Sequence, residues 1–395
     1  MADNKGPLAG VRVVEVANFI AGPYAGQLLA DLGADVVKVE MPGEGDPFRA
    51  FNGGTYSPQF VGYNRNKRSI ETDIRSKEGQ EIVKALVRRS DVLVENFRPG
   101  VMKRFGLDYP ALNLLRPELI YCSVSGFGQD GPDADRPVYD TVGQALGGLL
   151  SQLIDIDRPR IVGPAFTDGL AGLTASYAIL AALHARDRNG VGQYVDVSMF
   201  ASTIAFLSSE VTRYFATGDL GGPRRRPSIS QSYAFTCREG QVITVHLSSP
   251  VKFWNAFTKA VERNDLRDDS RFSTRENRIE NFEELHETLA PVFRARSIDE
   301  WRERFVAFDV PHAQVNSLGE VFLEPQAQHL GLELRLQHPS EGEVVTVAPP
   351  VRFSGTPVGG LSAPPRLGQH TEDVLRELGI LPENEQSSAP EGNQP

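Results

Sequence analysis

One aspartate in the sequence stands where a carboxylate could act as a nucleophile. Asp168 lies in the segment Gly163–Gly169 and directly precedes a long uncharged stretch that is predicted to be helical. The start of a helix keeps a carboxylate ionised, and Gly169 leaves room for a bulky electrophile. A carboxylate that attacks a thioester forms a mixed anhydride, which a thiolate then reopens. A simple helix cap explains the same position, and the residues alone leave both interpretations open.

A second candidate segment, Asn96–Gly100, directly follows the predicted strand Asp91–Glu95. Ligands of open parallel sheets bind just beyond the carboxyl ends of the strands. An asparagine and an aromatic residue there suit a ligand with an amide or a base, and Arg98 and Arg104 could hold its phosphates. The alternative is a turn in which Asn, Pro and Gly serve the backbone alone.

Three weaker signals lie further along the chain. Ser125–Gly131 is rich in glycine and ends a predicted strand, which allows a close approach by a ligand. Asp140, after Tyr139, begins an apolar helix and is most simply its N-cap. The run Arg224–Arg226 is either a solvated loop or a contact for a carboxylate or phosphate.

The elements that must position these residues begin with a strand–turn–helix–strand unit. It comprises the strand Val11–Val16, a helix Tyr24–Leu32 that Gly33 ends, and the strand Asp35–Glu40. The turn lacks the Gly-x-Gly-x-x-Gly pattern of dinucleotide sites, and Pro23 at the helix start gives up an N–H that could hold phosphate. We therefore expect neither a nicotinamide nor a flavin.

Further alternation extends this unit into a sheet. Ser76 can cap a helix, which leads to the strand Asp91–Glu95, and another strand spans Leu119–Val124. Strands and helices that alternate with short connections predict an α/β fold with a doubly wound parallel sheet. After this part, which extends over residues 1–217, we predict a linker over 218–227, a smaller α+β domain over 228–324, strands and a helix over 325–382, and a disordered tail over 383–395.

Composition restricts the function further. The 395 residues include 41 basic and 51 acidic side chains, a net charge of −10, which disfavours a nucleic-acid or anionic membrane surface. Cys122 and Cys237 are expected to be reduced, buried residues of a cytoplasmic protein, and the seven scattered histidines predict no metal site. The N-terminus lacks the apolar core of a signal peptide. The uncharged stretch Gly169–Ala185 is too short and polar to span a bilayer and is predicted to be a buried helix.

Several ordered segments resemble the class III CoA-transferases, the CaiB/BaiF family, which contains formyl-CoA transferase and carnitine CoA-transferase and has acyl-CoA racemases as relatives. The resemblance extends from Leu8 to Leu378. The segments that carry it are Leu8–Val16, Ala21–Pro23, Leu32–Asp46, Asn64–Ile70, Val94–Gly100, Ser123–Pro132, Arg136–Asp140 and Gly192–Ser198.

This resemblance implies a ring-shaped subunit in an interlocked homodimer. Residues 1–217 and 325–382 would build one large, Rossmann-like domain that binds coenzyme A, and Asp168 would be the nucleophile. The family's contacts with coenzyme A fall on Ile20 and Ala21, on Thr72, Asp73, Ile74 and Arg75, on Asn96, Phe97 and Arg98, on Arg104, and on Pro137, Val138, Tyr139 and Asp140.

Differences from known family members restrict the substrates and the type of reaction that we expect. Formyl-CoA transferase has glutamine in place of Ile20 and arginine in place of Met41, and Gly221-Gly222 is the nearest counterpart of its glycine run, so formyl-CoA and oxalate are not expected. Racemases have a histidine base where this chain has Tyr139, and an unactivated tyrosine, with a pKa of about 10, is a poor base near neutral pH.

We therefore expect an acyl-CoA:carboxylate CoA-transferase that uses no metal or ATP. Asp168 would form a mixed anhydride and then an aspartyl-CoA thioester, with backbone N–H groups near Gly169 stabilising the oxyanion. An acyl-CoA donor, with succinyl-CoA common in the family, and a free dicarboxylic or hydroxy acid acceptor would be the substrates. The alternatives are α-proton chemistry of the 2-methylacyl-CoA racemase type and a non-catalytic protein that binds coenzyme A.

Overall fold

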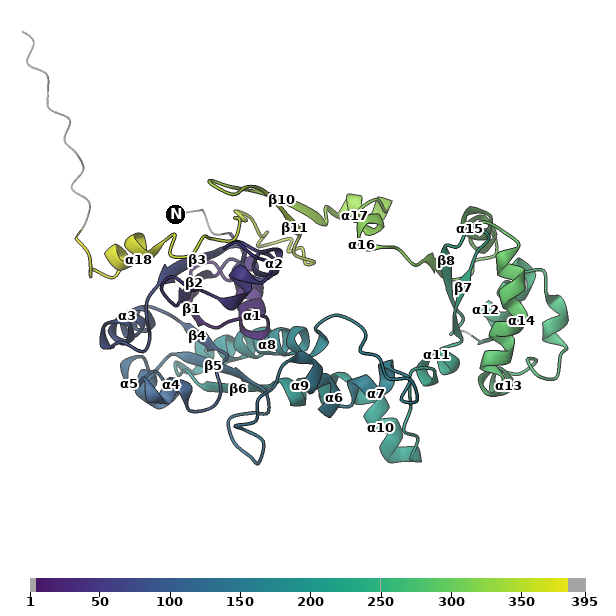
Figure 1. Cartoon of the computed structure of the whole chain (residues 1–395), viewed down its shortest axis with the longest axis horizontal. Helices are drawn as coiled ribbons and strands as arrows, with labels where there is room; N and C mark the ends of the chain where they lie inside the picture. The colour runs from purple at the N-terminus through teal and green to yellow at the C-terminus, as the bar shows by residue number, and fades with distance from the viewer. Residues whose placement is uncertain (1–4, 249, 383–395) are drawn as a thin grey trace, which may run out of the picture. The chain divides into compact units, whose positions relative to one another are not determined.

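The computed structural model describes residues 5–248 and 250–382, and the chain separates into two compact units (Figure 1). The first unit comprises Met1–Gly147, Gly163–Leu207 and Gly331–Pro395, and the second comprises Gly148–Val162 and Ser208–Leu330. The predicted tail over 383–395 lies outside the described residues.

The first unit is built on a six-stranded parallel sheet in the order β3-β2-β1-β4-β5-β6. This is the strand order of doubly wound, Rossmann-type sheets, and it confirms the predicted parallel architecture. Its strands are rich in β-branched residues and almost fully buried near the sheet centre, as expected where helices cover both faces. They are β1 (Arg12–Val16), β2 (Asp35–Glu40), β3 (Lys67–Glu71), β4 (Val92–Glu95), β5 (Ile120–Ser125) and β6 (Tyr194–Ser198).

Two hydrophobic cores cover the two faces of this sheet. Val13 belongs to the core that α1 (Ala21–Asp31) and α8 (Phe166–Asn189) complete, whereas the next residue, Val14, belongs to the core of the opposite face. Alternate side chains of a strand point to opposite faces, so both cores meet at β1. The helices of the second face are α3 (Lys77–Arg88), α4 (Val101–Arg104) and α5 (Tyr109–Leu115).

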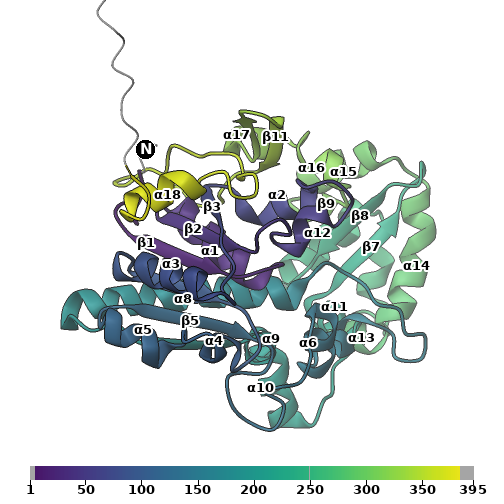
Figure 2. The same cartoon turned by 60° about the vertical axis from the view of Figure 1, so that its left-hand side comes forward.

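Short elements complete the first unit. They are the 3-10 helix η1 (Pro47–Ala50), α2 (Pro58–Asn64), α6 (Asp140–Leu146), α9 (Met199–Phe206), the antiparallel hairpin of β10 (Glu333–His338) and β11 (Gly342–Val347), and α18 (Thr371–Glu377). Helix α18 packs beside β3 (Figure 2). The C-terminal segment thus returns to the sheet that the N-terminal residues build.

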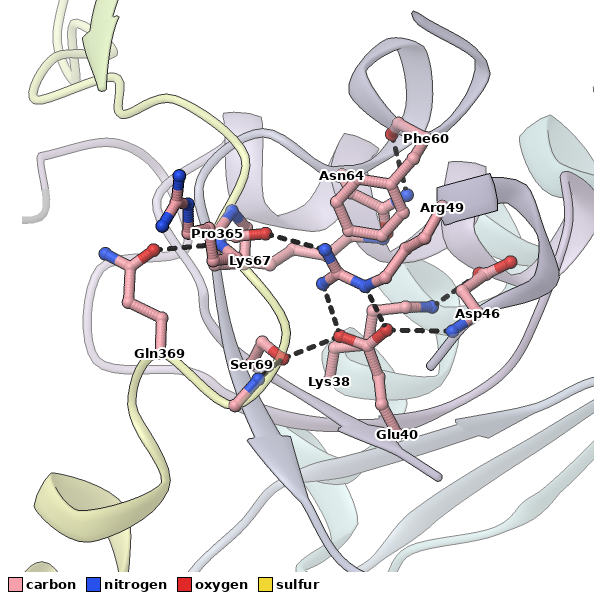
Figure 3. A network of polar contacts seen from close by, with 12 residues as sticks. Lys38, Glu40, Asp46, Arg49, Phe60, Asn64, Lys67, Ser69, Pro365 and Gln369 are labelled. Carbon is pink, nitrogen blue, oxygen red and sulfur yellow. Dashed lines mark hydrogen bonds and ion pairs between the residues drawn. The ribbon is translucent and has the colours of Figure 1, made fainter. Parts of the chain in front are cut away.

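A buried ionic network joins that returning segment to the sheet (Figure 3). Arg49 donates to Glu40 through Nε and Nη2, at 2.7 and 2.6 Å, and through Nη1 to the carbonyl of Pro365 at 3.1 Å. Burial opposes ionisation of Glu40, but the hydrogen bond from Arg49 and the charge of Lys38 outweigh it and lower the pKa of Glu40. Because each charge is paired and hydrogen-bonded, the network can lie inside the fold.

The second unit contains an antiparallel sheet of β7 (Ser232–Thr236), β8 (Val242–His246) and β9 (His312–Gln314). Helices α12 (Pro250–Ala260), α13 (Arg275–Glu280), α14 (Phe282–Arg294) and α15 (Ile298–Ala307) accompany it. Phe257, Phe293, Trp301 and Phe305 are fully buried in its core. This unit thus combines an antiparallel sheet with helices.

Its remaining elements are α7 (Leu149–Leu153), α10 (Ser208–Thr217), α11 (Arg225–Ser230), η2 (Asn264–Arg267), α16 (Leu318–Val321) and α17 (Pro325–Leu330). The boundaries therefore differ from the predicted ones, because residues 148–162, 208–217 and 325–330 group with the second unit. Helical periodicity shows that a helix forms but does not show which core it faces, and α10 carries no buried residue at all.

Helix α8 is, within residues 5–248 and 250–382, the one helix long and apolar enough to cross a membrane. Ala171, Ala175 and Ile179 on one of its faces are completely buried in the core of the first unit. Leu173 and Tyr177, on another face, are 48% and 64% exposed. The prediction of a buried helix thus holds for one face only.

Candidate active site

The loops after β1 and β4 meet at the point where the strand order reverses. Strands β1 and β4 are neighbours, and the chain continues from them toward opposite edges of the sheet. Asn96, directly after β4, donates through Nδ2 to the carbonyl of Asn18 at 2.8 Å and accepts from the Asn18 N–H at 2.9 Å. A switch point of this kind is the usual ligand crevice of an open α/β sheet. The Asn96 amide itself serves the backbone, as in the turn alternative.

Helix α1 begins beside this pair. Ile20 is its N-cap residue and Ala21 its first residue. Pro23 is therefore the third residue of the helix, whereas the sequence had suggested that it is the first. A Cβ at Gly22 would lie 2.5 Å from Cβ of Ala17 and 3.1 Å from Cγ of Asn96. Only glycine allows the helix to start this close to Ala17 and Asn96, and a helix start favours anionic ligand groups.

The other predicted contacts follow the carboxyl ends of their strands. Thr72–Arg75 come after β3, where Ile74 is buried and Arg75 pairs with Asp73 at 2.9 Å. Phe97 packs against the core, and its N–H donates to Glu95 Oε2 at 2.8 Å. Arg98 and Arg104 are exposed and place positive charge after β4.

Residues 137–140 connect the β5 side of the crevice to the candidate nucleophile. A Cβ at Gly126 would lie 2.0 Å from Cγ1 of Val138, so Val138 fills the space beside that glycine. The rings of Tyr139 and Phe19 lie edge to face with their centroids 5.9 Å apart. Tyr139 is also the N-cap residue of α6, with Asp140 its first residue.

Asp140 caps a different helix from the one predicted. Its Oδ1 accepts from the backbone N–H of Thr167 at 2.8 Å and of Asp168 at 3.2 Å, both in the first turn of α8. Asp168 is the third residue of α8 and caps nothing. The sequence allows each aspartate to cap its own helix, but the structure shows that Asp140 caps α8 and that Asp168 does not act as a cap.

The electrostatic environment of Asp168 is unusual for a surface carboxylate. Burial, and then the negative charge of Asp140, raise the pKa of Asp168 to about 7, so the expectation that the helix start keeps this carboxylate ionised is wrong: burial and the second carboxylate outweigh the helix start. A Cβ at Gly169, the next residue, would meet nothing within 4 Å. The N–H of Gly169 donates to the carbonyl of Ala165 at 3.1 Å, so it is not the free oxyanion donor that the sequence suggested.

Two tyrosines that the sequence did not indicate lie near this carboxylate. Burial, followed by the charge of Asp168, raises the pKa of Tyr63, and the rings of Tyr63 and Tyr24 are 5.7 Å apart. Both line a largely apolar cavity of about 600 Å³ in the first unit, together with residues of α1, α2 and β11 such as Leu28 and Val347. No motif marks these tyrosines, because only packing brings α2 toward α8.

The basic run of the second unit is partly neutralised. Arg224 pairs with Glu283 at 3.3 Å and Arg225 with Asp219 at 2.6 Å. Helix α11 begins at Arg225, so this segment is not wholly the loop that its composition suggests. The preceding Gly221-Gly222 turn has both φ angles positive.

Comparison with known proteins identifies the family. The model of CoA-transferase family III matches residues 8–371. Succinyl-CoA:glutarate CoA-transferase of Homo sapiens is 35% identical over 95% of this chain and 87% of its own, and succinyl-CoA–D-citramalate CoA-transferase of Chloroflexus aurantiacus is 34% identical over 96% of both chains. A crystal structure of a CaiB/BaiF family protein from Brucella suis superposes with a TM-score of 0.84 at 34% identity, covering 95% of this chain and all of that one. The chain therefore belongs to CoA-transferase family III, and it is a CoA-transferase.

Proposed function

We propose that this enzyme moves coenzyme A from an acyl-CoA to a free carboxylic acid through a covalent intermediate on Asp168. The observation that carries the proposal is the state of that carboxylate. Burial raises its pKa to about 7, a Cβ at the next residue, Gly169, would meet nothing within 4 Å, and its backbone N–H is held by Asp140. A poised carboxylate of this kind has no structural task, because Asp140 already caps the helix.

The reaction is a double exchange of thioester and anhydride. An ionised Oδ of Asp168 attacks the thioester carbonyl, the C–S bond breaks, and the thiolate of coenzyme A leaves. The thiolate then attacks the aspartyl carbonyl of the mixed anhydride, which releases the donor acid and leaves an aspartyl-CoA thioester. The acceptor carboxylate reverses both steps, so an activated acyl group is conserved throughout.

The crevice between β1 and β4 supports the placement of coenzyme A. The N-terminus of α1 at Ile20 and Ala21 and the exposed cations Arg98 and Arg104 favour phosphates there. We infer further contacts along Thr72–Arg75, Asn96–Phe97 and Pro137–Asp140, which follow β3, β4 and β5. Such a series of loops suits an extended ligand whose thioester end reaches Asp168.

We infer that the substrates are the acyl-CoA esters and free forms of small dicarboxylic acids, with succinyl-CoA as a donor. The relatives named above use succinyl-CoA with glutarate and with D-citramalate, according to their names. At 35% and 34% identity the acceptor acid can differ between family members, so a panel of acids is the appropriate test.

We also infer a cytoplasmic homodimer. Three helices of the first unit that pack on one another, α6, α8 and α9, expose Leu146, Leu173, Tyr177 and Phe206 at 41% to 64%. A helix that is apolar all round is normally covered, and a second copy of the chain would cover α8. Sedimentation at nanomolar concentration should show a dimer and no active monomer.

The activity test uses succinyl-CoA with a panel of free acids, in deuterated water. We expect new acyl-CoA esters whose formation requires the acid, and no deuterium at the α-carbon of the recovered thioester. Rapid α-deuteration without transfer to any acid would instead support the racemase type of chemistry. Coenzyme A binding with neither reaction would support a non-catalytic role.

A further inference from the structure

The loop between β1 and α1 adopts a backbone conformation that its own residues do not favour. Phe19, the residue before the N-cap of α1, has φ +65. This left-handed region favours glycine, and a bulky residue remains there only where the surroundings hold it. The loop carries Ile20 and Ala21, which the proposed function places against coenzyme A.

Groups from three other segments hold this loop. Asn96 bonds the N–H and carbonyl of Asn18, as described above. Lys38 donates through Nζ to the carbonyl of Ala17 at 2.6 Å. Asp46 accepts the N–H of the left-handed residue, Phe19, on Oδ1 at 3.1 Å.

Asp46 performs this task from inside a closed charge network (Figure 3). Its Oδ2 lies 3.0 Å from Nζ of Lys38, which also pairs with Glu15 at 2.9 Å, and all three side chains are completely buried. Its Oδ1 accepts the N–H of Phe48 at 2.9 Å as well as that of Phe19. A buried apolar group of the same size would pack equally well but could not accept those two N–H groups.

The ring of Phe19 connects the Asp46 network to the segment that contacts Asp168. It lies edge to face with Phe48, with centroids 5.5 Å apart, and with Tyr139 at 5.9 Å. Tyr139 directly precedes Asp140, which binds the backbone N–H of Asp168 at 3.2 Å. A continuous series of contacts therefore runs from Asp46 through Phe19 and Tyr139 to the start of α8.

We propose that Asp46 is a positioning residue that fixes Phe19 in its left-handed conformation and so sets the surface on which coenzyme A binds. This rests on the proposed function, which places the β1–α1 loop in the binding site. Asp46 itself is buried and touches no substrate. Its effect is exerted through the ring and backbone of Phe19.

An Asp46→Asn substitution separates the two tasks of the carboxylate. Asparagine has one acceptor oxygen, so it can serve either Lys38 or the two N–H groups but not both. We expect the Kd for coenzyme A, measured by calorimetry on the full-length enzyme, to rise about tenfold, the effect of one lost hydrogen bond. The KM for succinyl-CoA should rise in parallel, while kcat changes less than about twofold.

The double variant tests whether the effect passes through Phe19. Phe19→Ala removes the ring from a half-buried position outside the ion network and should raise the Kd by a similar factor. If Asp46 acts through Phe19, the two substitutions together should cost no more than either alone. The inference would be overturned if the fold-increases in Kd multiply in the double variant, or if either single variant leaves the Kd unchanged. The Phe19→Ala result can be interpreted even if Asp46→Asn does not fold.

A matched control excludes general loosening of the fold. Asp31, at the other end of α1, is also a buried aspartate paired with a cation, Arg65. Asp31→Asn should lower the melting temperature as Asp46→Asn does but leave the Kd for coenzyme A unchanged. Equal effects of both variants on Kd would contradict the positioning role. A wild-type enzyme that neither binds nor transfers coenzyme A would instead refute the proposed function and, with it, this inference.

Discussion

Replacing Asp140 by asparagine should shift the pH dependence of the first half-reaction toward acid. Asparagine keeps an oxygen that can accept the N–H groups of Thr167 and Asp168, so the start of α8 remains capped. It removes the negative charge that, after burial, is the second cause of the raised pKa of Asp168. The nucleophile should therefore ionise at lower pH in the variant.

The expected size of this effect follows from the two causes. The pKa of Asp168 rises from 3.8 to about 7, and burial contributes more to that rise than Asp140 does. At an effective dielectric constant of about 20 to 40, two neighbouring carboxylates interact by about 1 to 3 kcal/mol, and here burial accounts for the larger share of the rise. We therefore expect the apparent pKa to fall by about 1, from about 7 to about 6.

The assay is the pH profile of kcat/KM for succinyl-CoA between pH 5 and pH 9, because this parameter reports the ionisation of the free enzyme. Asp133→Asn is the control, since it removes the same charge from an exposed position paired with Arg136. Its profile should match the wild-type one. An Asp140→Asn profile that stays at about 7, or moves toward higher pH, would refute the assigned electrostatics.

Three further predictions concern the same region. First, the raised pKa means that folded Asp168 holds its proton more tightly than the unfolded chain does, so the carboxylate lowers the free energy of unfolding progressively from about pH 4 to about pH 7. Asp168→Asn should therefore raise the free energy of unfolding by about 2 kcal/mol more at pH 8 than at pH 4, after allowance for partial solvent access, and an equal rise at both values would contradict this. Second, Gly172→Val should destabilise the fold by about 2 to 3 kcal/mol in urea denaturation, because a Cβ there lies 2.9 Å from the carbonyl of Ala21; a neutral effect would show that α1 and α8 can separate. Third, Gly169→Ala should stabilise α8 by about 0.5 to 1 kcal/mol, whereas Gly169→Leu should fold but lose turnover, because its side chain fills the space that is open at Gly169. Normal turnover of the leucine variant would argue against a thioester bound in that space.

The sheet could be predicted from sequence because its signals are local. Neighbouring residues alone indicate the strand that begins near Val11 and the end of the first helix at Gly33. The rule for open parallel sheets makes the loops after β1, β3 and β4 candidates for ligand binding. The family resemblance then implied that Asp168 is the nucleophile.

Relations between distant segments could not be predicted in the same way. Asp140 and Asp168 both begin helical segments, so each looked like the cap of its own helix, and only the meeting of α6 and α8 makes Asp140 the cap of α8. Tyr63 carries no motif, and its position beside Asp168 depends on how α2 packs. Lys38 lies in a strand that looks purely structural, although its ammonium group is completely buried beside the β1–α1 loop.

The measurement that tests the central claim most directly is the mass of the enzyme after incubation with succinyl-CoA and no acceptor acid. We expect a covalent adduct of coenzyme A, mapped by peptide mass spectrometry to Asp168, that disappears when the acceptor acid is added and is absent from Asp168→Asn. A fully active enzyme that forms no adduct, or one whose adduct maps to another residue, would contradict the account.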